Sequence, residues 1–188
     1  MSMAKNQITD SRGNMYIKQE DFNYIYVVDT SVLIEDPKVF FRLGRSQIFI
    51  PMAVMKELDG LKKSTNLARA GAARRVTRIL DGLSGSQDIA HGASTSSGSI
   101  VRIFSRYMTI DGLASDADNK IVGAALRLKL ETGNANVIVL TTDGNMRNVA
   151  RSYGMKAQNY PLTPNHFVDN PVTKPYSRTK PSLDTKAA

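Results

Sequence analysis

Short, uninterrupted apolar runs alternate along this chain with stretches whose apolar residues recur every three or four positions. The runs span residues 24–29, 47–50, 100–104 and 136–143, and the more polar residues 155–160 are a candidate for a last strand. A continuous apolar run is typical of a strand buried on both faces, and strands that alternate with helices form parallel sheets. We therefore expect an α/β fold with three layers, α/β/α, around a central, mostly parallel twisted sheet of four to five strands.

The helical stretches lie between these runs. Two short helical pieces broken at Pro37 follow the first run, and Pro51 opens a helix in which Val54, Leu58 and Leu61 share one face. Further helices are predicted at residues 66–83, 118–130 and 144–154, the last closed by Gly154.

The domain organisation follows from where the apolar pattern starts and stops. Residues 1–21 are predicted to be a polar leader, residues 22–160 a single domain, and residues 161–188 a basic, proline-containing tail or linker. Residues 84–99 are rich in Ser and Gly without periodicity, which indicates a mobile loop inside the domain.

Composition excludes several kinds of chemistry. The chain has no cysteine and only two histidines, His91 and His166. Disulfides, thiolate zinc sites and Ser-His-Asp triads are therefore not expected, and any metal would be held by oxygen ligands, which favours Mg²⁺ or Mn²⁺. No stretch is long and apolar enough for a membrane span or a signal core, so we expect a cytoplasmic protein with no membrane partner.

The formal net charge of +8 is concentrated in two segments. The tail is basic, and residues 61–82 carry one acid against six basic residues: Lys62, Lys63, Arg69, Arg74, Arg75 and Arg78. A basic helix and tail on a neutral body indicate a polyanionic partner such as nucleic acid. A solvated helix face beside a disordered tail would produce the same charge pattern.

Four acids occupy positions that favour a shared site. Asp29 and Asp143 each end an apolar run, and ligands of open α/β sheets bind outside the carboxyl ends of the strands. Glu57 and Asp118 fall on the apolar stripes of their helices, where an unpaired acid is costly. Each acid alone has a structural explanation, as a helix cap, a turn residue or an ion-pair partner. If the four converge, a divalent cation is the usual remedy for their repulsion.

The stretches "YVVDTSVLI", "FIPMAVMKELDGLKK", "DADNKIVGAALRL" and "VIVLTTDGNMRNVA" resemble, in this order, the PIN domain, a family of metal-dependent nucleases, and most closely the PIN domain found ahead of PhoH-like ATPases. The resemblance covers about residues 24–160. It implies that Asp29, Glu57, Asp118 and Asp143 hold the metal, with Asp116 as a rival to Asp118. It also implies supporting roles for Ser31, Thr142 and Asn145, and weaker ones for Thr30 and Arg147.

The expected activity is hydrolysis of phosphodiester bonds in single-stranded RNA with Mg²⁺ or Mn²⁺. A DNA nuclease with the same site, and a nucleic-acid-binding or assembly module with little catalysis, stay open as alternatives. The segment "DGLKKST" lacks the spacing of a phosphate-binding loop, so ATP binding is not predicted. By family analogy, the partners are RNA or DNA, a second copy of the chain, an antitoxin or an ATPase domain.

Overall fold

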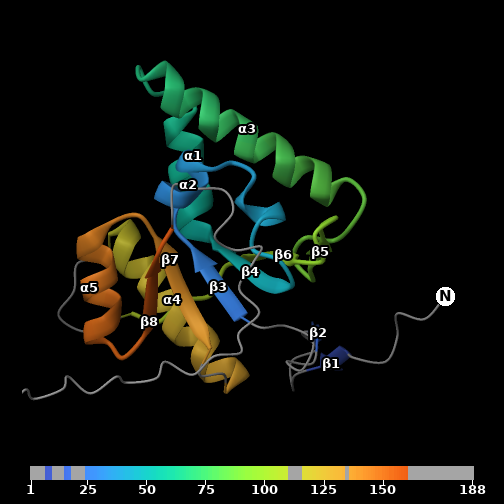
Figure 1. Cartoon of the computed structure of the whole chain (residues 1–188), viewed down its shortest axis with the longest axis vertical. Coiled ribbons are helices and arrows are strands. Elements are labelled where there is room, and N and C mark those ends of the chain that lie inside the picture. The colour runs from blue at the N-terminus through green and yellow to red at the C-terminus, as the bar shows by residue number, and fades with distance from the viewer. Residues whose placement is uncertain (1–6, 10–14, 18–23, 110–115, 134–135, 161–188) are drawn as a thin grey trace, which may run out of the picture.

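Six strands form the central sheet in the order β5-β6-β4-β3-β7-β8 in this computed structural model (Figure 1). All neighbours pair in parallel except β5, which runs antiparallel to β6 at one edge. The strands are β3 (Tyr24–Val28), β4 (Ser46–Pro51), β5 (Ala93–Ser94), β6 (Ile100–Phe104), β7 (Val137–Thr141) and β8 (Lys156–Asn159). The prediction of a mostly parallel α/β sheet is confirmed.

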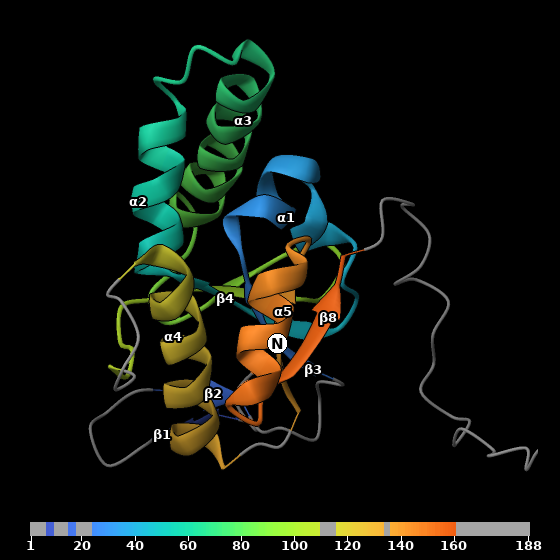
Figure 2. The same cartoon turned by 90° about the vertical axis from the view of Figure 1, so that its left-hand side faces the viewer.

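Helices connect the parallel strands. They are α1 (Thr30–Glu35), the short 3₁₀ helix η2 (Val39–Phe41), α2 (Met52–Leu61), α3 (Leu67–Ser84), α4 (Ala117–Thr132) and α5 (Gly144–Ser152). Helices α4 and α5 lie side by side against β3, β4, β7 and β8 (Figure 2). Because parallel crossovers are right-handed, the connections through α1 and through α2 and α3 belong to the opposite face.

The structure describes residues 7–9, 15–17, 24–109, 116–133 and 136–160. The segment expected to be a polar leader contains two short strands, β1 (Gln7–Thr9) and β2 (Met15–Ile17), which pair antiparallel. The predicted tail at 161–188 lies outside the described residues. Among the helices that are described, none is both long and apolar enough to cross a membrane.

The core lies between the sheet and its helices. The central strands β3, β4 and β7 are almost wholly buried, which explains why their sequences are continuous apolar runs rather than alternating ones. Phe40, Phe49 and Leu33 are among the largest side chains that are fully buried. Each side chain of this size stabilises the fold by about 1.5–3 kcal/mol through its removal from water.

The Ser/Gly-rich segment contains β5, which its composition did not indicate. Thr95 Oγ1 lies 2.7 Å from Ser99 Oγ, and Ser99 Oγ donates to the carbonyl of Phe40 at 2.6 Å. These buried hydroxyls satisfy one another and the loop that carries Phe40, so the polar composition here belongs to a packed edge. The sheet consequently has six strands instead of the predicted four to five.

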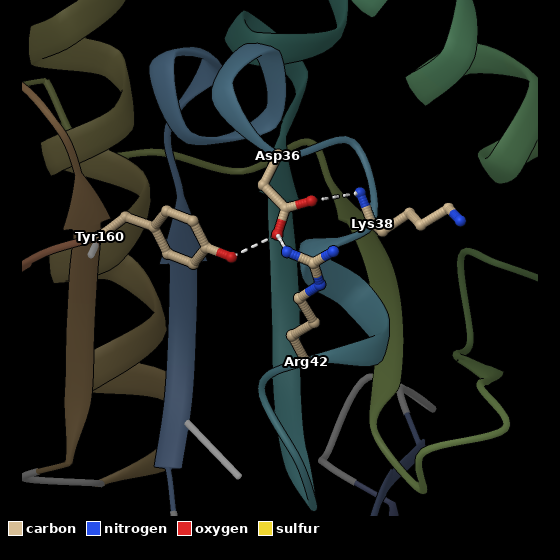
Figure 3. A network of polar contacts seen from close by, with 4 residues as sticks. All are labelled: Asp36, Lys38, Arg42 and Tyr160. Atoms are coloured by element: carbon tan, nitrogen blue, oxygen red, sulfur yellow. Dashed lines mark hydrogen bonds and ion pairs between the residues drawn. The ribbon is translucent and has the colours of Figure 1, made fainter. Parts of the chain in front are cut away.

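A polar network joins the end of the described domain to α1 (Figure 3). The carboxylate of Asp36 accepts hydrogen bonds from the hydroxyl of Tyr160, from Arg42 Nη1 at 2.9 Å and from the backbone N–H of Lys38 at 3.0 Å. Asp36 is 9% exposed, so its charge is compensated by these donors. The network ties together residues 124 positions apart in the sequence.

Candidate metal centre at the ends of two parallel strands

Asp29 and Asp143 follow two strands that are neighbours in the sheet. Strands β3 and β7 pair in parallel with Val28 opposite Leu140, and the backbone N–H of Asp29 donates to the carbonyl of Leu140 at 3.0 Å. The carboxyl ends of both strands therefore meet at one edge of the sheet. This adjacency, on which the predicted site depends, is confirmed.

The carboxylate of Asp29 is buried and held by hydroxyl groups. Its residue is 5% exposed and stands at the N-cap position of α1, yet its side chain caps no backbone N–H of that helix. Instead, Oδ2 accepts hydrogen bonds from Ser31 Oγ and, at 2.7 Å, from Thr141 Oγ1. No described residue donates to Oδ1, which leaves that oxygen available to a cation. The helix-cap explanation for Asp29 is therefore wrong.

Two backbone N–H groups hold these hydroxyls in turn. Ser31 Oγ accepts from Thr142 N at 3.1 Å, and Thr141 Oγ1 accepts from Asp143 N at 3.0 Å. The turn after β7 thus uses its backbone to orient both donors to Asp29. Thr142, named from the sequence for its hydroxyl, contributes its N–H here. Thr141 was not named, although strand pairing places it opposite Asp29.

Glu57 reaches the site from α2. Its residue is half-buried, and Oε2 accepts a hydrogen bond from Thr30 Oγ1 at 2.8 Å. Thr30 is 3% exposed and begins α1 directly after Asp29. Two adjacent residues at the start of α1 therefore position two carboxylates: Thr30 bonds to Glu57, and Ser31 bonds to Asp29.

An acid caps the start of α5, and another acid caps the start of α4. Asp143 Oδ1 accepts from the backbone N–H groups of Asn145 at 2.7 Å and Met146 at 3.3 Å. Asp116 Oδ1 caps α4 by accepting from Asn119 N at 2.9 Å. Because Asp116 serves as the cap, the carboxylate of Asp118 in the first turn is left without that structural role.

The pKa of the Asp118 carboxyl responds to burial and to the other acids. Partial desolvation raises the pKa of the Asp118 carboxyl, and the charges of Asp29, Asp116, Asp143 and Glu57 raise it further. The beginnings of α2 and α4 lie close together in Figure 2, and the two helices are in contact. The charge of Asp118 is therefore repelled by acids that come from the other segments of the candidate site.

This donor set fits a hard divalent cation. It supplies carboxylate and hydroxyl oxygen without thiolate or imidazole, which matches the ligand preference of Mg²⁺ and Mn²⁺. Within the described part of the chain, no three of these acids are close enough together to form a ready-made metal-binding group. The acids therefore form a candidate centre whose carboxylates would have to draw closer around an ion.

Some of the other predicted site residues, namely Arg147, Lys62 and Arg74, bond to groups of the protein itself. Arg147 Nη1 donates to the carbonyl of Thr141 at 3.2 Å and to Asn159 Oδ1 at 2.8 Å, tying α5 to β7 and β8. Lys62 Nζ lies 2.7 Å from Asp59 Oδ1, and Arg74 Nη1 donates to the carbonyl of Lys62 at 3.0 Å. The other predicted nucleic-acid-binding residues are exposed: Lys63, Arg69, Arg75 and Arg78. Their role stays a prediction.

Comparison with known families assigns the chain to a family. The family model described as "PIN domain" matches residues 26–161, a span that contains all five acids. The chain belongs to the PIN domain family. PIN domains are a family of nucleases, so the resemblance seen in the sequence is confirmed.

Two curated relatives extend the comparison. Protein PhoH2 of Bacillus subtilis (strain 168) is 27% identical over 145 residues, which are 72% of this chain and 33% of that protein. Protein PhoH2 of Thermobispora bispora is 29% identical over 140 residues, 72% of this chain and 31% of that protein. The chain thus spans about a third of the length of these relatives. The predicted likeness to PIN domains of PhoH-like proteins is confirmed.

A solved structure also matches. It is a domain of a functionally unknown protein from Methanocaldococcus jannaschii DSM 2661, with a TM-score of 0.48 and 18% sequence identity, and the match covers 73% of this chain and 91% of that chain.

Proposed function

We propose that this PIN domain is a metal-dependent endoribonuclease that hydrolyses phosphodiester bonds in single-stranded RNA. One observation carries the proposal: the carboxylate of Asp29 is buried at the carboxyl end of β3, beside the end of β7 that leads to Asp143, and Thr141 holds it there. The pKa of Asp118, which desolvation and then the charges of the other four acids raise, supports it. No described basic side chain forms an ion pair with these carboxylates. Their mutual repulsion therefore destabilises the fold unless a cation binds among them.

In this proposal, Asp29, Glu57, Asp118 and Asp143 hold Mg²⁺ or Mn²⁺, with Asp116 as the alternative to Asp118. When bound, the cation would activate water and stabilise the charge that develops on the phosphate.

The chain's own side chains have separate tasks. Ser31 and Thr141 fix the carboxylate of Asp29 through their hydroxyls, and Thr30 orients Glu57. Hydroxyls that hydrogen-bond to metal-binding carboxylates usually fix the orientation of those carboxylates before the metal binds. The exposed arginines of α3 would bind flanking phosphates, with an affinity that falls as salt rises and little sequence preference.

The partners implied by the family are part of the proposal. The PhoH2 relatives are about three times as long as the matched region, so an ATPase domain, covalently joined or separate, is the first partner to look for. A second copy of the chain and a small antitoxin rest on family analogy alone.

The test is cleavage of matched single-stranded RNA and DNA oligonucleotides by purified protein with Mg²⁺, Mn²⁺ or EDTA. We expect RNA to be cut with either metal and not in EDTA. Asp29→Asn should lower the cleavage rate by more than about 100-fold. It removes a proposed metal ligand, whose loss costs more than the loss of a residue that only orients a ligand. Asp59→Asn is the matched control, since Asp59 is an exposed acid of α2 paired with Lys62.

Other outcomes would point elsewhere. Cleavage of DNA alone, lost in Asp29→Asn, would replace RNA by DNA as the substrate. Binding of either nucleic acid without cleavage under any metal would favour a binding or assembly module. Cleavage that survives Asp29→Asn would show that the crevice is not the active site.

A further inference from the structure

A pocket of about 510 Å³ opens beside the carboxylates. Its walls come from the start of α2, the end of β6 with the residues after it, and the first turns of α4: Pro51, Met52, Lys56, Glu57, Phe104, Tyr107 and Lys120 among others. Its volume lies in the range of about 300–1,000 Å³ that is usual for small-molecule sites. Glu57 lines the pocket and is also one of the predicted metal ligands, so the pocket lies next to the candidate centre.

The lining of the pocket combines an apolar floor with exposed aromatic and basic groups. Phe104 is 6% exposed and forms part of the floor, whereas Tyr107 and Met52 are 47% and 39% exposed. Large exposed apolar side chains are uncommon in the described residues, and two of them line this one pocket. Exposed aromatic and thioether groups beside a cavity indicate a surface that contacts a flat, apolar partner.

Two ammonium groups face the same space. Lys56 precedes Glu57 on α2, and Lys120 lies one half-turn after Asp118 on α4. Neither lysine forms an ion pair or a side-chain hydrogen bond with a described residue, so both charges are available to an anion. Arg106, also in the lining, is already committed: its Nη2 lies 3.0 Å from Glu131 Oε2, and its guanidinium stacks on Phe104 at 5.2 Å.

The backbone that carries Tyr107 is held against α4. Met108 N donates to the carbonyl of Gly123 at 3.0 Å. A Cβ on Gly123 would lie 2.2 Å from Met108 O, so only glycine permits this approach. The aromatic ring is therefore presented from a fixed backbone at the edge of the pocket.

We propose that this pocket binds one nucleotide of the RNA strand, next to the phosphate that is cut. Its base packs against Tyr107 and Met52, and its phosphate lies between Lys56 and Lys120. Stacking on an exposed aromatic ring requires an unpaired base, so this site selects single strands over duplexes. The proposal rests on the proposed nuclease function, to which it adds the position of the neighbouring nucleotide.

The test measures RNA binding separately from cleavage. A fluorescein-labelled single-stranded RNA of mixed sequence is titrated with protein in EDTA and followed by anisotropy. Tyr107→Ala should weaken binding about tenfold or more, because one base–aromatic stack is lost. Tyr107→Phe should bind like the wild type. Tyr153→Ala, which removes an exposed tyrosine after α5, is the control.

The two lysines are tested through salt dependence. The double variant with Lys56→Met and Lys120→Met should reduce the slope of log affinity against log salt by about 1.4, the value for two lost contacts to single-strand phosphates. Lys129→Met is the control, because Lys129 lies near the other end of α4 from Lys120. An unchanged slope in the double variant would overturn the phosphate contact.

The outcomes separate this inference from the proposed function. Wild-type protein that cuts RNA, with Tyr107→Ala binding as tightly as the wild type, would overturn the pocket and keep the nuclease. Wild-type protein that binds RNA without cutting it, with Tyr107→Ala weakened and Tyr107→Phe intact, would support the pocket and overturn the nuclease. If Tyr107→Ala weakened the binding of duplex RNA as much as the binding of single-stranded RNA, the stacking role would be overturned.

Discussion

At the scale of single residues, Asp29 shows how local chemistry can be redirected by a neighbouring strand. An acid directly before a helix normally accepts from that helix's first N–H groups. Here the carboxylate turns to Ser31 and Thr141, and no side-chain cap forms. The helix gives up a stabilising contact, and a buried carboxylate keeps one oxygen for another partner. Such a trade is expected where function outweighs local stability.

The hydroxyl of Thr141 should matter to catalysis. Thr141→Val keeps the shape of the buried side chain but removes the donor to Asp29 and the acceptor of Asp143 N. We expect Mn²⁺-dependent cleavage and Mn²⁺ affinity to fall about 10–100-fold, the usual effect of losing a group that orients a ligand. Initial rates and calorimetric titration of Mn²⁺ measure both. Thr142→Val, at the adjacent position, should leave the rate close to wild type, and equal losses in the two variants would contradict the assignment.

Asp118 should cost the protein stability when no metal is bound. Its pKa is raised by desolvation and by the other acids, so the folded state binds more protons than the unfolded state between the ordinary and the raised pKa. The free energy of unfolding therefore falls as pH rises through that window. Asp118→Asn removes the penalty, which is fully present above the raised pKa.

We accordingly expect Asp118→Asn to unfold at higher urea than the wild type in EDTA at pH 7.5. The difference should shrink as the pH is lowered through the raised pKa of Asp118, because the carboxyl then takes up a proton and loses its charge. Added Mn²⁺ should stabilise the wild type more than the variant, because the metal binds the folded site that the variant lacks. A variant that is less stable than the wild type in EDTA at pH 7.5 would show that the acids do not repel one another.

At the scale of elements, the site depends on how α4 meets its neighbours. The start of α4 carries Asp118 and Lys120, and its next turn lies against the segment after β6 through Gly123 and Met108. The helix thus positions a carboxylate, a basic group and, indirectly, Tyr107. The close approach at Gly123 is the contact on which this arrangement depends most directly.

Replacing Gly123 tests that contact. Gly123→Ala forces a methyl group to within 2.2 Å of a backbone oxygen, so α4 or the segment at Met108 has to move. We expect a loss of about 1–3 kcal/mol in the free energy of unfolding, measured by urea denaturation. Gly82→Ala is the control, since Gly82 lies in α3 with open space around its Cβ position, and it should stabilise by about 0.4–1 kcal/mol. Equal behaviour of the two variants would contradict the close packing.

At the scale of the whole molecule, the two ends of the described domain are joined across the sheet. Tyr160 follows the edge strand β8, and its hydroxyl donates to Asp36 at the end of α1 (Figure 3). Burial raises the pKa of Tyr160, and the hydrogen bond to Asp36 raises it further, so the hydroxyl stays protonated where exposed tyrosines ionise. The bond closes a loop that contains most of the domain, including Glu57, Asp116, Asp118 and Asp143, while Asp29 lies just before it.

Removing that hydroxyl should weaken the entire fold. Tyr160→Phe leaves Asp36 with Arg42 and the N–H of Lys38 but without one donor, at 9% exposure. We expect a cost of about 1–3 kcal/mol, measured as a shift in the urea midpoint with an unchanged slope. Tyr153→Phe removes an exposed hydroxyl that bonds to no described residue and should change little. An unchanged urea midpoint for Tyr160→Phe would show that Arg42 and the N–H of Lys38 satisfy Asp36 without the hydroxyl.

Much of this architecture was accessible from sequence. The apolar runs predicted β3, β4, β6 and β7, because strands buried on both faces need unbroken apolar residues. The edge strand β8 was predicted as a last strand without such a run. The acids at the ends of β3 and β7 were recognised because parallel strands share one carboxyl edge. The two-residue strand β5 was missed, since it is held by hydroxyl bonds to a distant carbonyl and leaves no local pattern.

The sequence by itself determined the α/β class and the family and singled out the acids as candidates, because each follows from local periodicity or from motifs within a few residues. Only the tertiary structure decided that Thr141 holds Asp29, that Asp116 caps α4 in place of Asp118, and that Lys56, Tyr107 and Lys120 line one pocket. Those facts depend on strand register and on contacts between segments far apart in the chain. Patterns within a few residues do not predict which distant segments come into contact. Those contacts are therefore known only once the sheet and its helices are placed in three dimensions.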